Sequence, residues 1–336
     1  MQNNQKLMTK IKLLAMKKFF VLLAVLGLFT TQQVIAQAGA DRLAEINAAS
    51  ASEVDSSGWV SGGGLGVDFA QLALINPRVG AGSNRIGFGG LGSIYANYKK
   101  GNLSWTNNGS IQLSAQRIGG STEPFQKNLD VIRAASRAGY GFTEKVFGAV
   151  EANVTTLLLP TYEGNVLSSD TASLLARFAS PLTFVLSPGI DYKPNDKLSF
   201  FYSPASLKLI YVADDAIAAL NVHGNEVGSN SFLQLGSNLK GIYNDKFADD
   251  KVTLTSTLDL YSNYLLNPQN IDVLWQNDLG FVIFKNFSVN LVTELFYDHD
   301  ILVQTDRNDN GILEEGELGR RISFTEALLI KYNFIF

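Results

Sequence analysis

The end of this chain alternates apolar or aromatic residues with polar ones and stops on an aromatic side chain. The run is Ile330-Lys331-Tyr332-Asn333-Phe334-Ile335-Phe336, whose period of two is that of a β-strand with two different faces. A single apolar and aromatic face is typical of the strands of an outer-membrane β-barrel. We therefore interpret the run as the last strand of such a barrel and expect Phe336 to act as an assembly signal.

The same alternation recurs upstream in segments separated by turns. It is clearest between residues 103 and 118, where Trp105, Ile111 and Leu113 share one parity and the other parity is polar. One face of such a segment would meet lipid and the other a wet interior. Twelve segments follow this pattern, near residues 59–74, 86–98, 103–118, 129–141, 146–159, 180–193, 197–212, 231–243, 251–263, 272–285, 287–299 and 320–336.

The connections between these segments alternate in length. Short ones with turn-forming residues lie at 99–102, 143–145, 193–196, 244–250 and 285–286. Longer ones lie near 75–85, 119–128, 160–179, 213–230, 264–271 and 300–319, as the outward loops of such barrels do. The prediction is an all-β fold, an up-and-down antiparallel transmembrane β-barrel of about twelve strands at residues 58–336. An even strand number places both termini on the periplasmic side of the outer membrane.

Two segments leave the strand count open. In 129–141, Arg133 and Arg137 share the parity of apolar Val131, and in 197–212 aromatic residues occupy both parities. Counts of ten or fourteen strands are therefore alternatives to twelve.

The beginning of the chain has the composition of an export signal. Residues 1–18 carry five lysines and no acid, residues 19–29 are apolar, and Ala36-Gln37-Ala38 offers small residues for cleavage. This pattern predicts a signal peptide at 1–38, because the apolar run falls short of the roughly 20 residues of a membrane anchor. Met16 is an alternative start, and cleavage after Ala36 fits almost as well. Residues 39–57 are small and polar, which predicts a flexible periplasmic lead-in.

Charge and composition exclude several classes of function. Removal of the leader lysines takes the formal net charge from -4 to about -9, so nucleic acid is not an expected partner. The chain has no cysteine, which excludes disulfides, thiolate metal sites and cysteine nucleophiles. A hydrophobic content of 46% without another long apolar run excludes a helical membrane protein. The expected partners are outer-membrane lipid, the barrel-assembly machinery during insertion, and a small polar solute.

Several short motifs follow one another along the chain at characteristic spacings. They are Gly58-Trp59 with Gly62-Gly63, Gln71 to Asn76, Tyr98-Lys99-Lys100-Gly101 before Trp105, Gly139-Tyr140-Gly141, Ser180-Pro181, Gly189-Ile190-Asp191-Tyr192-Lys193-Pro194-Asn195-Asp196 and Ser203-Pro204. In this order and spacing the chain resembles an uncharacterised barrel family of Bacteroidetes, domain of unknown function 3078. The resemblance implies an outer-membrane location and a barrel, and it brings no catalytic residues.

One long connection contains a motif for calcium. Residues 306–317 fit the twelve-position loop Asp-x-Asn-x-Asn-Gly-x5-Glu, in which Gly311 permits the sharp turn. The flanking segments read as strands, so the loop alone is EF-hand-like, and it would order the last outward loop. The alternative is an acidic surface loop that stays solvated. Calcium is the one cofactor that the sequence suggests, with the predicted ligands Asp306, Asn308, Asn310, the Ile312 carbonyl, Glu314 and Glu317.

Two other patterns are weaker indications of a functional site. Asp298-His299-Asp300 could orient a general base, but neighbours in a strand point to opposite faces, and no serine can be paired with His299 from sequence. Glycine runs such as 62–64 and 87–92 lack the Lys-Ser or Lys-Thr of a phosphate loop, and we expect close strand contacts there. We therefore predict no catalytic residues and no enzyme.

The inward parities carry a mixed set of charges that leans acidic. If water fills the lumen the set would favour cations modestly, and if the charges pair across a narrow interior they would seal it. The set comprises Asp68, Glu151, Asp191, Lys240, Asp259, Asp278 and Glu294. Aromatic residues near strand ends are predicted to anchor the barrel at the membrane interfaces, namely Tyr95, Tyr98, Trp105, Trp275, Tyr297 and Tyr332.

These patterns favour one function and leave two others open. The first hypothesis is passive or loop-gated passage of small polar solutes through the lumen. The second is a sealed barrel with a structural or surface-interaction role that uses its calcium-ordered loop. The third is an outer-membrane hydrolase.

Overall fold

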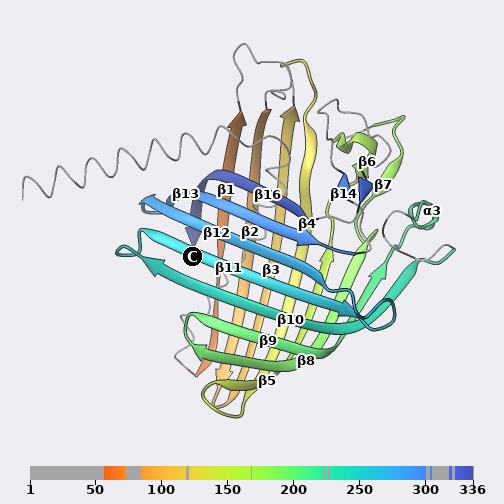
Figure 1. The fold of residues 1–336 in the computed structure, drawn as a ribbon. Helices are drawn as coiled ribbons and strands as arrows, with labels where there is room; N and C mark the ends of the chain where they lie inside the picture. The colour runs from red at the N-terminus through yellow and green to blue at the C-terminus, as the bar shows by residue number, and fades with distance from the viewer. Residues whose placement is uncertain are drawn as a thin grey trace, which may run out of the picture. The chain divides into compact units, whose positions relative to one another are not determined.

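The fold, given by a computed structural model, is a closed β-barrel with strands tilted across one another (Figure 1). The structure describes residues 57–72, 85–118, 121–167, 169–221, 223, 225, 228–299, 303–304, 318–319 and 322–335. All of these residues belong to one compact unit of the chain, Val34–Phe336. The predicted signal peptide at 1–38, the lead-in at 39–57 except Ser57, and Phe336 lie outside the described residues.

The barrel wall consists of twelve strands, each antiparallel to its neighbours. They are β1 (Gly58–Leu72), β2 (Arg85–Lys100), β3 (Leu103–Ile118), β4 (Gln126–Gly141), β5 (Val146–Thr156), β8 (Leu182–Asn195), β9 (Leu198–Tyr211), β10 (Ser231–Phe247), β11 (Val252–Asn263), β12 (Asp272–Phe284), β13 (Phe287–Tyr297) and β16 (Ser323–Ile335). Consecutive wall strands pair with each other, and β16 closes the barrel by pairing with both β13 and β1. The predicted up-and-down barrel of twelve strands is confirmed.

Short turns gather at one end of the barrel and long connections at the other. Gly58 pairs with Lys99 beside the β2–β3 turn, and Asn333 N donates to Asn286 O in the β12–β13 turn at 2.9 Å. The start of β1 and the end of β16 therefore both lie at the short-turn end of the barrel, as the even strand number requires. The turn predicted at 244–250 was placed too early, because β10 continues to Phe247, which pairs with Val252. Asn244 looks like a turn former, yet it is part of the ladder.

The outward face of the wall is apolar. Leu65, Ile94, Trp105 and Ile330 are all exposed and share the outward parity of their strands. The interior is mainly polar, the reverse of a soluble protein, as the alternation predicted.

The aromatic anchors predicted from sequence include one error. Tyr95 is buried and shares the inward parity of β2 with buried Ser93 and Asn97, so it packs in the lumen. Trp105 and Trp275 are exposed on the outside, and each indole N–H donates to a serine on a neighbouring strand, Ser136 at 2.9 Å and Ser256 at 3.0 Å. Proximity to a strand end therefore does not settle which face an aromatic residue takes.

The two ambiguous segments are resolved by the chemistry of the lumen. Arg133 and Arg137 both lie on the inward parity of β4, where Arg133 Nη1 donates to Gln112 Oε1 at 3.2 Å. In β9, Phe201 is buried inside the barrel while its neighbours Phe200 and Tyr202 are exposed outside. Aromatic residues occupy both parities of β9 because Phe201 packs inside the barrel while the others face outward.

Several long connections carry structure of their own. They contain β6 (Thr161–Tyr162), the 3-10 turn η1 (Glu163–Asn165), β7 (Leu174–Ala176), α3 (Asp215–Ala219), β14 (Val303–Gln304) and β15 (Leu318–Gly319). Asp214 caps α3 by accepting from Ala216 N and Ile217 N, and it also pairs with Arg177 Nη2 at 2.7 Å. The β5–β8 and β9–β10 connections are therefore joined to each other. Among the described residues, no helix combines the length and the apolar character needed to cross a membrane.

Candidate functional site

A continuous chain of ion pairs runs along the inner wall from β8 to β11. Arg137 Nη1 donates to Glu151 Oε2 at 3.3 Å, and its Nη2 lies 2.9 Å from Asp191 Oδ2. Lys240 Nζ donates to Glu151 Oε1 at 3.0 Å and lies 4.0 Å from Asp259 Oδ2. We call these residues, together with Lys193, whose Nζ is 3.6 Å from Asp191 Oδ2, the charge chain. Its members, in order, are Lys193, Asp191, Arg137, Glu151, Lys240 and Asp259.

The strand register explains how these side chains meet. Arg137 and Glu151 are direct partners across β4 and β5, and Lys240 and Asp259 are direct partners across β10 and β11. The contact between Glu151 and Lys240 is different, because β8 and β9 lie between their strands. Two long side chains of opposite charge bridge that gap over the inner wall.

The guanidinium of Arg137 rests on an aromatic ring. Its Cζ lies 4.5 Å from the centre of the Phe201 ring, a cation–π distance. The ring fits because residue 189 is glycine: a Cβ there would stand 2.9 Å from two carbons of Phe201. Gly189 therefore makes room for the ring, and the ring holds Arg137 in place.

The side chains of the charge chain are partly open. Those of Arg137, Lys240 and Asp259 are 24%, 22% and 30% exposed, although all three point into the barrel. Lys193, at the short-turn rim, is 52% exposed. The charge chain therefore keeps open surface from the short-turn rim into the lumen.

A second charged group lies on the opposite part of the wall and is dry. Lys331 Nζ of β16 lies 2.5 Å from Asp278 Oδ2 of β12, with side-chain exposures of 0% and 7%. Asn290 Nδ2 donates to the other oxygen of Asp278 at 2.5 Å, and Ser288 Oγ donates to Asn290 Oδ1 at 2.6 Å. We call Lys331, Asp278 and Asn290 the buried cluster, and half-buried Ser288 lies at its edge. Its neighbours Val292 and Leu329 are also fully buried.

The predicted inward residues divide between these groups. Glu151, Asp191, Lys240 and Asp259 belong to the charge chain and Asp278 to the buried cluster, while Glu294 accepts from Gln276 Nε2 at 2.8 Å. Asp68 lies opposite Lys331 in the β1–β16 register.

The predicted inward set contained one cation, Lys240, and missed three others. Arg137 lies opposite Glu151, Lys193 shares the parity of Asp191 in the same strand, and Lys331 lies opposite Asp68. With them, the charge chain holds three positive and three negative groups, so its acidic lean disappears. The sequence did contain a sign of Arg137, because it shares the inward parity of β4 with Val131. In a strand read as apolar on that face, the arginine looked like an irregularity.

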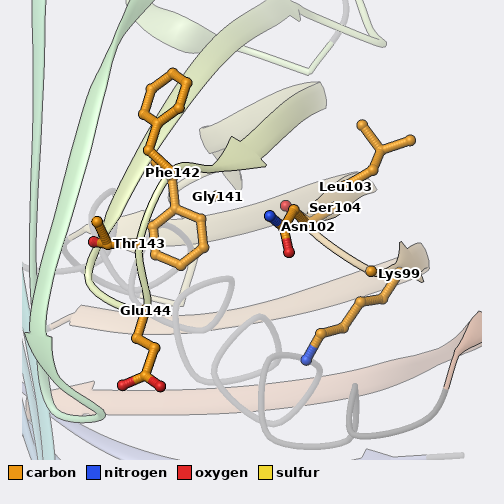
Figure 2. A pocket seen from close by; sticks show the side chains of 10 residues that line it. Lys99, Asn102, Leu103, Ser104, Gly141, Phe142, Thr143 and Glu144 are labelled. Carbon is orange, nitrogen blue, oxygen red and sulfur yellow. The ribbon is translucent and has the colours of Figure 1, made fainter.

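A hollow of about 330 Å³ opens at the short-turn rim beside the charge chain. Figure 2 shows it between the β2–β3 and β4–β5 turns, with Lys99 and Glu144 at its edge and Phe142 beside it. Phe147 also lines it, and Lys193 Nζ lies 5.3 Å from the centre of that ring. The hollow therefore adjoins the first member of the charge chain.

The predicted calcium ligands at 306–317 lie outside the described residues. The described pairs Val303 with Gly319 and Gln304 with Leu318 bring the two sides of that segment together. Within the described residues, no group of three or more His, Asp or Glu side chains is arranged to hold a metal ion. The Nδ1 of His299 lies 3.4 Å from Tyr297 Oη, and its predicted partner Asp300 is also outside the described part.

Comparisons with known proteins found one protein family and several solved structures. The family described as a protein of unknown function (DUF3078) matches residues 69–162, well under half of the chain. No curated protein matches. Similar solved structures include an outer membrane channel from Pseudomonas putida F1, with 11% identity, a TM-score of 0.39, and coverage of 84% of this chain and 96% of that one.

Two further structures show similar values. The translocator domain of the autotransporter NalP from Neisseria meningitidis has 8% identity, a TM-score of 0.35, and coverage of 88% and 94%. A mutant of the TodX monoaromatic hydrocarbon channel has 9% identity, a TM-score of 0.33, and coverage of 83% and 89%. Similarity at this level carries no information about what this chain binds or passes.

Proposed function

We propose that this protein is an outer-membrane β-barrel that passes small polar solutes along the wet side of its lumen. The membrane location is supported by the outward wall, where apolar side chains such as Leu65, Ile94 and Ile330 are exposed. A soluble protein rarely exposes so continuous an apolar surface. A closed barrel satisfies every backbone group of its wall, which lipid demands. The predicted signal peptide supports export.

The water exposure of the charge chain carries the proposal of passage. Ionised side chains line one part of the inner wall and keep between a fifth and a third of their surface open, as Arg137, Lys240 and Asp259 do. The buried cluster, by contrast, fills the wall near β12, β13 and β16. A polar solute would therefore follow the wall from β4 to β11.

The balance of charges predicts weak selectivity. A lumen lined by excess acids would prefer cations, but each acid of the charge chain is paired with a cation. We therefore propose that small cations and anions pass about equally well. This differs from the modest cation preference that the acids alone suggested.

The orientation follows from the two ends of the barrel. Outer-membrane barrels keep short turns toward the periplasm and long loops outside. We propose that the short-turn end, with both ends of the wall, faces the periplasm. The joined β5–β8 and β9–β10 connections then stand over the outer mouth.

We also propose that the segment 306–317 binds calcium and orders the last outer loop. The β14–β15 pairing supports a closed loop, because it holds both sides of the segment together. Calcium titration should show binding in the weak range of roughly 10⁻⁴ to 10⁻³ M. Glu317→Gln should weaken it, while Glu315→Gln, at a non-ligand position of the same loop, should not. Equal binding by both variants would remove the site.

Single-channel recording in a planar bilayer tests the passage. The refolded protein should give stable current steps, and Thr257→Trp, which adds bulk to the inner face of β11, should reduce their size. Leu258→Trp, one residue further along, places the same bulk in lipid and should leave the steps unchanged. A folded, heat-modifiable protein that passes no current would instead indicate a sealed barrel.

A further inference from the structure

The carboxylate of Glu151 is held like a bound ligand. Its Oε2 accepts from Arg137 Nη1 at 3.3 Å, and its Oε1 accepts from Lys240 Nζ at 3.0 Å and Asn153 Nδ2 at 2.8 Å. A guanidinium and an ammonium converge on the two oxygens of one carboxylate. Charge-assisted bonds of this kind are the strong ones by which proteins bind small anions.

Both cations have other supports. Arg137 stacks on Phe201 and pairs with Asp191, and Lys240 has Asp259 at 4.0 Å. Arg137 Nη2 is buried against Asp191 Oδ2, 2.9 Å away, whereas Nη1 holds the Glu151 carboxylate. The two cations would therefore stay in place if the Glu151 carboxylate turned away.

The clamp is open to the lumen. Arg137 and Lys240 are 24% and 22% exposed, and Glu151 itself is 12% exposed. The carboxylate of Asp278 has similar partners, Lys331 and Asn290, but Lys331 is 0% exposed where Lys240 is 22% exposed. Only the first of these two carboxylate clamps can exchange its occupant with a solute.

We propose that Arg137 and Lys240 form a binding site for the carboxylate of a small organic acid, and that Glu151 occupies this site at rest. This inference deepens the proposed passage and rests on it for its biological role. A passing monocarboxylate takes the place of the Glu151 side chain between the two cations. Exchange of one carboxylate for another keeps Arg137 and Lys240 paired throughout, while the displaced Glu151 carboxylate turns into the lumen and returns when the solute leaves.

Chemical rescue with acetate tests the site without any need for current. Glu151→Ala removes the tethered carboxylate and leaves room for a free one. Acetate should raise the unfolding temperature of this variant in a saturable way, with a dissociation constant of about 1–100 mM, as expected for so small a ligand. Chloride at the same ionic strength should not. Asp278→Ala is the matched control, because its site is closed to water, and acetate should leave its unfolding temperature unchanged.

The outcomes separate the site from the passage. Stabilisation of both variants, of neither, or by chloride as well as acetate would overturn the site. If Glu151→Ala fails to fold, Glu151→Gln keeps the size of the side chain and its Asn153 contact. Acetate should then stabilise Glu151→Gln more than the wild type, because it displaces a neutral amide from the two cations, and equal stabilisation of the two proteins would overturn the site. Acetate rescue in a barrel that passes no current would keep the site and reject the passage.

Discussion

The charge chain and the buried cluster use the same kinds of side chains in different surroundings. Lys240 with Glu151 and Lys331 with Asp278 are both lysine–carboxylate pairs, at 3.0 Å and 2.5 Å. The first pair is 22% and 12% exposed, and the second is 0% and 7% exposed. Water around the first pair lets it exchange partners, and its absence around the second makes each partner indispensable to the other. Exposure, more than residue type, separates a lumen lining from a structural clamp.

The largest effect is expected from the buried cluster. Lys331→Met leaves the Asp278 carboxylate buried without its cation, which should cost about 3–5 kcal/mol of unfolding free energy. Urea unfolding of the refolded barrel measures it. Adding Asp278→Asn should restore most of the loss, because the uncompensated charge is gone. If Lys331→Met alone were as stable as the wild type, water would have to reach the buried cluster.

The second largest effect is expected at Gly189, beside the Phe201 ring that supports Arg137. Gly189→Ala places a methyl group against the backbone carbonyl of Tyr202 and 2.9 Å from the Phe201 ring, and should destabilise the barrel by about 1–3 kcal/mol through overpacking. Gly92→Ala is the control, because the nearest atom to its new methyl group would be 3.4 Å away. Equal unfolding midpoints for the two variants would mean that both β9 and the Phe201 ring can shift to accept the methyl group.

Charge reversal in the lining should change selectivity more than stability. Lys240→Glu turns the balance of the charge chain from three against three to two against four, so the reversal potential in a KCl gradient should move toward cation preference. Lys197→Glu makes the same change in the turn outside the wall and should have a much smaller effect. A Lys240→Glu barrel with wild-type selectivity would place the ion path elsewhere.

The smallest effect is expected from an exposed pair at the rim. Lys197 Nζ donates to Asp245 Oδ2 at 3.0 Å, and this hydrogen bond raises the pKa of Lys197 above its usual value. A raised pKa means that the contribution of the pair is present at neutral pH and is lost only as pH rises through that alkaline pKa. Lys197→Ala should therefore leave the unfolding midpoint at pH 7 almost unchanged, as usual for solvated pairs. A clear loss there would make the rim as important as the buried cluster.

The wall of the barrel could be predicted from sequence because each strand has two faces in two solvents. Alternation and turn residues located all twelve wall strands and both ends of the wall. The end of β10 was misplaced because a tertiary contact decides it: β10 continues through Asn244, which pairs with β11. Tyr95 was misplaced because its position near a strand end was given more weight than its parity, which it shares with buried Ser93 and Asn97. The short β6–β7 pair and α3 depend on contacts between loops, such as Arg177 with Asp214.

The candidate site was predictable only in part. The acids of the lumen and Lys240 stood out by parity. The pairing of Glu151 with Lys240 did not, because this contact crosses two intervening strands. Sequence spacing carries no sign of such a contact. Whether a given charge is wet or dry also depends on the packing of the whole lumen, as the contrast between Asp259 and Asp278 shows.

The contrast between a wet and a dry side of the lumen can be measured directly by cysteine labelling, since the chain has no cysteine of its own. Thr257 of β11 and Val292 of β13 both point inward, five residues after the start of strands that run in the same direction. Thr257→Cys and Val292→Cys are close in size to the native residues. A small charged thiol reagent should modify Thr257→Cys rapidly in the folded barrel and leave Val292→Cys, which is 1% exposed in the native chain, protected until unfolding. Equal protection of both cysteines would mean a lumen that is sealed throughout, and would contradict a polar path along the charge chain.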